Sequence, residues 1–108
     1  MTKEEIEGAL GICCGNTDAM RDHLHKTLRL LAARSDANSG PSKTEDGWNK
    51  GTKALEAHLG DLYGPMGAVY LHYLDRLDLI EHGCGIAGSW PTKRGRELLE
   101  ALNKVAAP

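Results

Sequence analysis

The sequence contains no phenylalanine, and aromatic residues make up only 5% of its 108 positions. Leucine, isoleucine, valine, alanine and methionine must therefore build the core. Its three cysteines are an odd number, which does not fit the disulfide framework of a secreted protein. No apolar run approaches the roughly 20 residues that span a bilayer, and the acidic segment Met1–Glu7 does not have the pattern of a secretory signal. We therefore expect a cytoplasmic chain that does not enter a membrane.

The chain also lacks a strong excess of charge of either sign, because its formal net charge is −2. This balance argues against indiscriminate attraction to nucleic acid or to an anionic membrane. Any basic surface that binds nucleic acid must therefore be local. The length fits a single domain over residues 1–108, which is too short for two independent cores.

Two helices are predicted within residues 1–34. Thr2 is expected to cap the first helix, and the second is expected to begin at Thr17. Apolar residues recur in the second helix at spacings of four and three, which predicts one buried face. This face consists of Met20, Leu24, Leu28 and Leu31. The cations expected to point elsewhere are Arg21, Lys26, Arg29 and Arg34.

Residues 35–51 have the composition of a loop, since they are rich in turn-forming residues and lack periodic apolar positions. A polar loop of this length is long for a compact domain, and such loops usually carry a function or are disordered. Trp48 allows two interpretations. It either docks the loop onto the body of the protein or is an exposed binding residue.

The predicted core of the domain, residues 52–108, begins with a helix, a turn and a second helix. Thr52 is expected to open the first of these helices. Pro65 fits the first turn of the next, which we expect to cover residues 65–78. The apolar stripe of this second helix consists of Met66, Val69, Tyr70, Tyr73, Leu74 and Leu77.

A short hairpin and a final helix are expected to follow. Residues 79–90 form two strand-like pieces around a glycine-rich turn, and Pro91 is expected to end the pairing. Thr92 can cap the last helix, and Gly95 permits this helix to pack closely against the hairpin. The inward face of the last helix is predicted to be Leu98, Leu99, Leu102 and Val105.

Two segments of this region carry a family resemblance, namely Tyr73–Glu81 (YLDRLDLIE) and Trp90–Leu99 (WPTKRGRELL). Through them, residues 52–104 resemble the winged helix-turn-helix superfamily, in the broad manner of PadR-like and MarR-like bacterial regulators. The resemblance implies a mostly α fold with a small β-hairpin wing, preceded here by two extra N-terminal helices. It further implies a transcriptional regulator that binds double-stranded DNA as a homodimer.

In this interpretation the helix over residues 65–78 lies toward the major groove, and the wing lies along the DNA backbone. The expected contacts from the helix are Tyr70, His72, Tyr73 and Arg76. The expected backbone clamp consists of His82, Lys93, Arg94 and Arg96. Tyrosines at helical spacing also fit half-buried packing, and cations at a helix start also fit an ordinary solvated surface.

A second hypothesis follows from the low charge of the same helix. Arg76 is its only fixed cation, and Asp75 and Asp78 oppose it. This composition favours a winged-helix protein-interaction module, such as an adaptor or an inhibitor of a host or phage complex, that does not bind DNA.

The adjacent thiols of Cys13 and Cys14 are the remaining chemical candidates. Vicinal thiols can bind soft metals or respond to oxidation, and Cys84 would supply a third ligand if the fold brought it near. The alternative is that they are small buried apolar side chains, because the spacing does not match a structural zinc site. No serine lies in a nucleophile motif, and no glycine-rich phosphate loop is present. We therefore expect neither enzymatic activity nor a cofactor.

Overall fold

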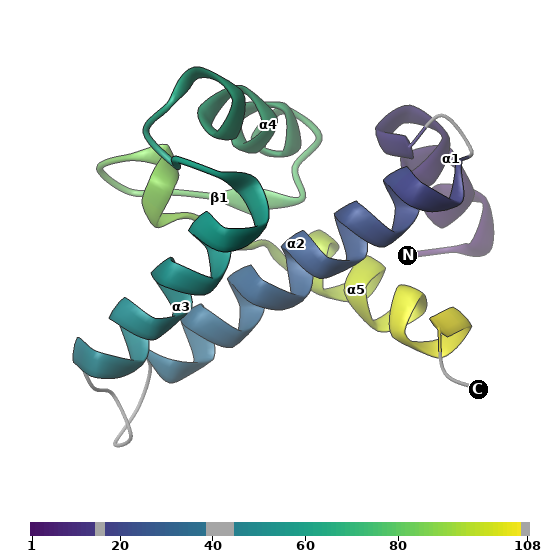
Figure 1. The fold of residues 1–108 in the computed structure, drawn as a ribbon. Helices are drawn as coiled ribbons and strands as arrows, with labels where there is room; N and C mark the ends of the chain where they lie inside the picture. The colour runs from purple at the N-terminus through teal and green to yellow at the C-terminus, as the bar shows by residue number, and fades with distance from the viewer. Residues whose placement is uncertain (15–16, 39–44, 107–108) are drawn as a thin grey trace.

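The computed structural model describes residues 1–14, 17–38 and 45–106. Its α-helices are α1 (Lys3–Cys14), α2 (Asp18–Ala37), α3 (Glu45–Leu59), α4 (Pro65–Arg76) and α5 (Lys93–Ala106). Two short strands, β1 (Ile80–Glu81) and β2 (Trp90–Pro91), pair antiparallel, and a 3-10 turn, η2 (Ile86–Gly88), lies between them. The described part of the chain is thus mostly helical with one small hairpin, as the sequence predicts (Figure 1).

The long helix α2 lies at the centre of the molecule (Figure 1). It contacts α1, α3, α5 and β2. Thr17 caps this helix, because its side-chain oxygen accepts a hydrogen bond from the Met20 N–H at 3.3 Å. The predicted apolar face is confirmed in its three leucines, whereas Met20 is exposed. The fully buried leucines of α2 are Leu24, Leu28 and Leu31.

Helix α2 continues to Ala37 and helix α3 already begins at Glu45. The loop predicted over residues 35–51 is therefore wrong at both ends. Trp48 and Gly51 lie inside α3. A Cβ atom at Gly51 would lie 2.7 Å from the Cβ of Arg34, which shows how closely α2 and α3 pack at this point. Packing against α2 thus stabilises a helix whose own composition is unfavourable.

Arg34 fastens the hairpin to α2. The sequence pattern places this residue on the outer face of the helix, but it is only 1% exposed. Its Nη2 donates hydrogen bonds to the carbonyl oxygens of Ala87 at 2.8 Å and Ser89 at 3.1 Å. Its Nη1 donates to the Thr52 hydroxyl at 3.1 Å. The guanidinium carbon also lies 4.1 Å from the centre of the Trp48 ring, so Trp48 docks α3 onto the body of the protein.

Helix α4 ends at Arg76, two residues before the predicted end, in a turn that leads directly into β1. Asp78 adopts a left-handed backbone conformation with φ of 61°. Its N–H donates to the Asp75 carbonyl oxygen at 3.0 Å. The N–H of Leu79 donates to the Leu74 carbonyl oxygen at 3.1 Å, which completes a Schellman motif. An aspartate here takes the position that glycine usually occupies.

Thr92 joins the hairpin to α5. Its N–H donates to the Leu79 carbonyl oxygen at 3.1 Å, and its hydroxyl donates to the Asp78 carbonyl oxygen at 2.6 Å. Pro91 was expected to end the pairing, but it is a member of β2 and lies opposite Ile80. Proline is tolerated there because the ladder is short and the next N–H supplies the hydrogen bond.

Gly95 allows α5 to approach β1, as predicted. Its N–H donates to the Thr92 hydroxyl oxygen at 3.0 Å, which confirms the expected cap. A Cβ atom at this position would lie 1.9 Å from the Leu79 carbonyl oxygen. Farther along α5, Leu98 and Leu102 are buried as predicted, whereas Val105 is 74% exposed because it lies in the last turn of α5.

Candidate functional site

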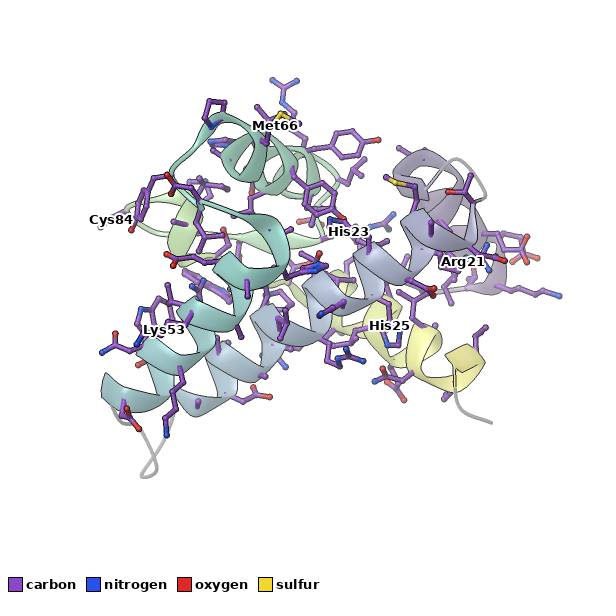
Figure 2. The ribbon with its side chains drawn as sticks, in the orientation of Figure 1. Arg21, His23, His25, Lys53, Met66 and Cys84 are labelled. Carbon is purple, nitrogen blue, oxygen red and sulfur yellow. The ribbon has the colours of Figure 1, made fainter. Side chains whose placement is uncertain are left out.

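The outer face of α4 is apolar. Met66 is 80% exposed and Val69 is 64% exposed, although the sequence pattern places both on the inner face. Tyr73 is exposed one helical turn farther along, and Figure 2 shows Met66 pointing away from the body of the protein. We call Met66, Val69 and Tyr73 the α4 ridge. The residues that α4 buries instead are Gly67, Leu71 and Leu74.

Gly67 explains which face of α4 turns inward. A Cβ atom at Gly67 would lie 2.6 Å from the carbonyl oxygen of Asp61, so the turn before α4 presses against the helix at this residue. Only glycine permits this approach. The helix therefore turns its smallest residue toward the body, and this orientation exposes Met66 and Val69.

The far end of the α4 ridge meets α1. The hydroxyl of Tyr73 donates a hydrogen bond to the backbone carbonyl oxygen of Ile12 at 2.8 Å. Ile12 is itself a large exposed hydrophobic residue. The last turn of α1 thus adds apolar surface beside the ridge.

The surroundings of α4 are acidic. Residues 60–91 contain one arginine, Arg76, and four carboxylates, which are Asp61, Asp75, Asp78 and Glu81. Arg76 is exposed near the end of the helix. The Nε2 atom of His82 lies 3.8 Å from an Asp75 carboxylate oxygen.

The structure separates the residues predicted to contact DNA into different environments. Those with exposed side chains are His72, Tyr73, Arg76, Lys93 and Arg96, and those that are half-buried are Tyr70, His82 and Arg94. The rings of His72 and His82 lie together, with centroids 6.3 Å apart. The Nη2 of Arg96 instead donates to an Asp36 carboxylate oxygen at 3.1 Å, which directs Arg96 toward the end of α2.

A shallow groove of about 410 Å³ lies beside the tip of the hairpin. Three aromatic side chains line it, namely Trp48 from α3, Tyr63 from the turn before α4, and Trp90 from β2. Tyr63 is 82% exposed. The indole N–H of Trp90 donates to a Glu81 carboxylate oxygen at 2.9 Å, which orients that ring. We call this the aromatic groove. Sequence reasoning missed it because the three residues are far apart in the chain and no periodic pattern connects them.

Two histidines and a tyrosine meet where α2, α3 and α4 pack together. The His23 and His58 ring centroids are 4.3 Å apart, and Tyr70 lies 5.0 Å from His23. The Thr27 hydroxyl donates to the His23 carbonyl oxygen at 2.8 Å, so the His58 Nε2 at 2.9 Å from Thr27 must itself carry the proton. Burial lowers the pKa of His23, and the nearby Lys26 lowers it further. Burial and the proximity of His23 likewise lower the pKa of His58, against a smaller opposing effect of its hydrogen bond to the His23 backbone.

These lowered pKa values predict a loss of stability in mild acid. The unfolded chain takes up protons on both histidines near their ordinary pKa of about 6.5, whereas the folded chain keeps them neutral to lower pH. The free energy of unfolding should therefore be constant above this pH and fall as the pH decreases below it. Urea denaturation between about pH 7 and pH 5 measures this. His58→Gln should flatten the dependence, whereas the same substitution at the exposed His72 should not.

The cysteine hypothesis concerns Cys13, Cys14 and Cys84. The side chains of Cys13 and Cys14 lie outside the described residues. Cys84 is free and exposed at the hairpin tip. Within residues 1–14, 17–38 and 45–106, no group of three or more histidine, cysteine, aspartate or glutamate side chains is arranged to hold a metal ion.

No family model, no curated protein and no solved structure matches this chain. Among the helices of the described segments, none combines the length and apolar character needed to cross a membrane.

Proposed function

We propose that this chain is a winged-helix module that binds a protein partner through the α4 ridge and the aromatic groove. The exposure of Met66 and Val69 carries the proposal. Both lie on the helix that, by resemblance, would read DNA, and both expose most of their apolar surface to water. Burying this surface against a partner is favourable, whereas polar DNA bases and phosphates offer it little.

The aromatic groove supports the same proposal. Tryptophan and tyrosine are enriched at the centres of protein interfaces, where they dominate the binding energy. Trp48, Tyr63 and Trp90 make up three of the five aromatic residues of the chain. Tyr63 lies only three positions before Met66, so one partner can contact the groove and the start of the ridge together.

The charges around the ridge also favour protein over DNA. The carboxylates of Asp61, Asp75, Asp78 and Glu81 would face the phosphates of a duplex bound to α4. Such contacts are repulsive, because affinity for a duplex comes largely from neutralising its phosphates with cations. A protein partner with basic residues around an apolar centre would complement this surface.

The test of this proposal is a substitution in the ridge. The purified chain is immobilised and exposed to nuclease-treated lysate of its source cells, and the captured protein is identified, purified and titrated by calorimetry. Val69→Glu should weaken that binding by about thirtyfold or more, which is the scale of an interface hot spot. Lys53→Gln, on the exposed surface of α3, is the matched control and should bind normally. Unchanged affinity of the Val69→Glu variant would contradict the proposal.

A second candidate function is that of a DNA-binding transcriptional regulator acting as a homodimer in the cytoplasm. The order of elements, with α3, a turn, α4, the hairpin and α5, favours it. Lys93 is exposed at the start of α5 with Arg94 beside it, where a phosphate backbone next to a wing would lie.

Salt dependence separates the two candidates. Polarisation titrations of duplex DNA at about 50 and 200 mM salt should show binding that weakens steeply if the chain contacts phosphates. Lys93→Glu combined with Arg94→Glu should then abolish retention of the duplex. A protein interface centred on Val69 should depend little on salt. Steep, charge-dependent duplex binding that survives Val69→Glu would favour the regulator.

A further inference from the structure

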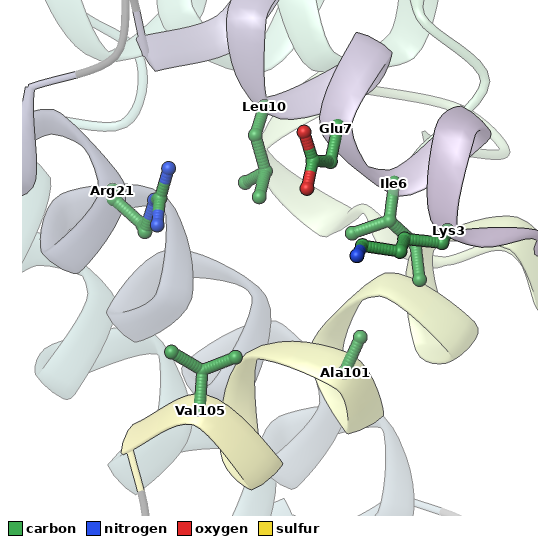
Figure 3. A pocket seen from close by; sticks show the side chains of 7 residues that line it. All are labelled: Lys3, Ile6, Glu7, Leu10, Arg21, Ala101 and Val105. Carbon is green, nitrogen blue, oxygen red and sulfur yellow. The ribbon is translucent and has the colours of Figure 1, made fainter.

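The aromatic groove differs in its lining from the cavity between α1, α2 and α5. That cavity, of about 440 Å³, has an aliphatic wall and charged side chains of both signs, from Lys3, Glu7 and Arg21 (Figure 3). The aromatic groove has a similar volume of about 410 Å³, but no charged side chain lines it. Its one aliphatic side chain is that of Ala87. The groove therefore suits an uncharged ligand that packs on aromatic rings.

Glycines leave the two indole rings of the groove uncovered. A Cβ atom at Gly83 would lie 4.0 Å from the Trp90 ring, and one at Gly88 would lie 3.9 Å from the Trp48 ring. A longer side chain at either position could extend over the indole that it contacts. Because both positions are glycine, surface of both indoles stays available to a ligand. The third ring, that of Tyr63, belongs to a side chain that is 82% exposed.

A cation is a poor occupant of the space between these rings. The guanidinium group of Arg34 already lies against the Trp48 ring, with its central carbon 4.1 Å from the ring centre. Its positive charge would repel a second cation placed on the same indole. The part of a ligand that enters the groove should therefore be neutral and apolar.

Two exposed carboxylates are attached to the aromatic residues of the groove. A Glu81 carboxylate oxygen accepts the indole N–H of Trp90 at 2.9 Å, and an Asp61 carboxylate oxygen accepts the backbone N–H of Tyr63 at 2.9 Å. Within residues 1–14, 17–38 and 45–106, neither carboxylate forms a salt bridge. Basic residues on either side of a neutral segment would complement these two charges.

The shape of the groove indicates the backbone conformation of its occupant. The strands β1 and β2 pair over only two residues, so the hairpin offers too short an edge for an added strand. A groove lined by aromatic rings is instead the kind of surface that binds proline-rich segments. Such segments adopt the polyproline II helix before they bind, so they lose little conformational freedom on docking. Their compact rings also need no deep pocket.

We propose that the aromatic groove binds a proline-rich segment of a protein partner in the polyproline II conformation, with flanking basic residues against Glu81 and Asp61. The prolines pack on the rings of Trp48, Tyr63 and Trp90. This inference rests on the part of the proposed function that assigns the groove to a protein partner, and it specifies the chemistry of that partner.

The test follows the groove by intrinsic fluorescence, because the two tryptophans of the chain, Trp48 and Trp90, both line it. The probe is a capped hexaproline peptide with an arginine at each end, titrated into the full chain under reducing conditions. It should change the tryptophan emission in a saturable manner. A peptide of the same charge with alternate prolines replaced by alanine should bind about tenfold more weakly. A hexaproline peptide with glutamate at each end should also bind more weakly.

Substitutions in the lining test the contacts of the rings. Tyr63→Ala should weaken binding of the arginine-flanked peptide by about tenfold or more, since an aromatic ring is lost from the interface. Its thermal unfolding midpoint should stay close to that of the parent, because the ring is largely exposed. Gly83→Leu should extend over the Trp90 ring and abolish the saturable change. Gly83 is exposed and a Cβ atom there makes only an ordinary contact, so this variant should fold normally.

A second pair of variants tests the flanking charge. Glu81→Gln keeps an oxygen that can accept the Trp90 N–H but removes the negative charge. It should weaken binding of the arginine-flanked peptide about two- to fivefold, which is the scale of an exposed ion pair. Glu56→Gln removes an exposed carboxylate from α3 and is the matched control, so it should bind the peptide normally.

The proposal is overturned if the hexaproline peptide causes no saturable change, if the alanine-containing peptide binds as tightly, or if Tyr63→Ala binds normally. It is also overturned if an oligothymidine strand binds more tightly than the peptide, since the rings would then stack on nucleobases.

The partner captured in the test of the proposed function separates the two failures. If the peptide does not bind while Val69→Glu still weakens binding of that partner, the proline assignment is wrong and the proposed function stands. If the peptide binds as expected while Val69→Glu leaves the affinity for the partner unchanged, the assignment of the α4 ridge is wrong and that of the groove stands.

Discussion

Replacing Arg34 with methionine is expected to lower the free energy of unfolding by about 3 kcal/mol, since several buried acceptors would lose their donor. The carbonyl oxygens of Ala87 and Ser89 would be left inside the protein without the guanidinium that now binds them. Trp48 would also lose the cation that stacks on its ring. Burial lowers the pKa of Arg34, but its ordinary value is so high that the group remains charged at neutral pH.

The measurement is urea denaturation followed by circular dichroism. Arg29→Met is the matched control, because Arg29 is an exposed cation on the same helix. That substitution should change the free energy of unfolding by less than about 0.5 kcal/mol. If both variants showed equally small changes, Arg34 would not be the residue that fastens the hairpin to α2.

Gly95→Ala should destabilise the protein by about 3 kcal/mol, since the added methyl group overlaps backbone atoms that no rotamer change can move. The new Cβ would lie 1.9 Å from the Leu79 carbonyl oxygen, which is far inside contact distance. To relieve this overlap α5 must move away from β1, and the Thr92 hydrogen bonds that hold the junction would lengthen.

Gly8→Ala should instead stabilise the protein when its unfolding is measured in the same way. Gly8 lies within α1, and a Cβ atom there would meet no other atom within 4 Å. Alanine favours the helix over glycine, so this variant should gain up to about 1 kcal/mol. Thermal and urea unfolding of the two variants together would separate the steric effect at Gly95 from helix propensity, which favours alanine at both positions. A stabilised Gly95→Ala variant would contradict the close packing of α5 on β1.

The sequence predicts well those features that depend on neighbouring residues. Thr2 and Thr92 are recognisable as helix caps because the hydrogen bond they accept comes from an N–H three residues later. Gly95 is recognisable because it lies directly after the hairpin, at the start of a helix with paired leucines. These signals are local, so they can be recognised without knowledge of the tertiary structure.

Features that depend on distant contacts could not be predicted. The start of α3 depends on the contact between Gly51 and Arg34, and propensity alone favours a loop there. The orientation of α4 depends on the approach of Asp61 to Gly67, and its apolar residues extend so far around the helix that periodicity alone does not identify the buried face.

The residues of the candidate sites also divide into those that local sequence predicts and those that depend on distant contacts. Arg76 and Lys93 are exposed where the sequence places them, but the aromatic groove combines residues from three separate segments of the chain. Arg34 shows the difficulty most clearly. A cation at a position out of phase with the leucine stripe predicts an exposed side chain, and only the carbonyl oxygens of a hairpin later in the chain explain its burial.

The attachment of the hairpin to Arg34 determines which parts of the molecule open together. A ladder of two residue pairs is too short to persist by itself in water. This hairpin instead derives its stability from a helix whose anchoring residue precedes Ala87 by 53 positions. The hairpin and the C-terminal half of α2 therefore belong to one cooperative unit, whose amide protons should exchange with solvent in a shared opening event.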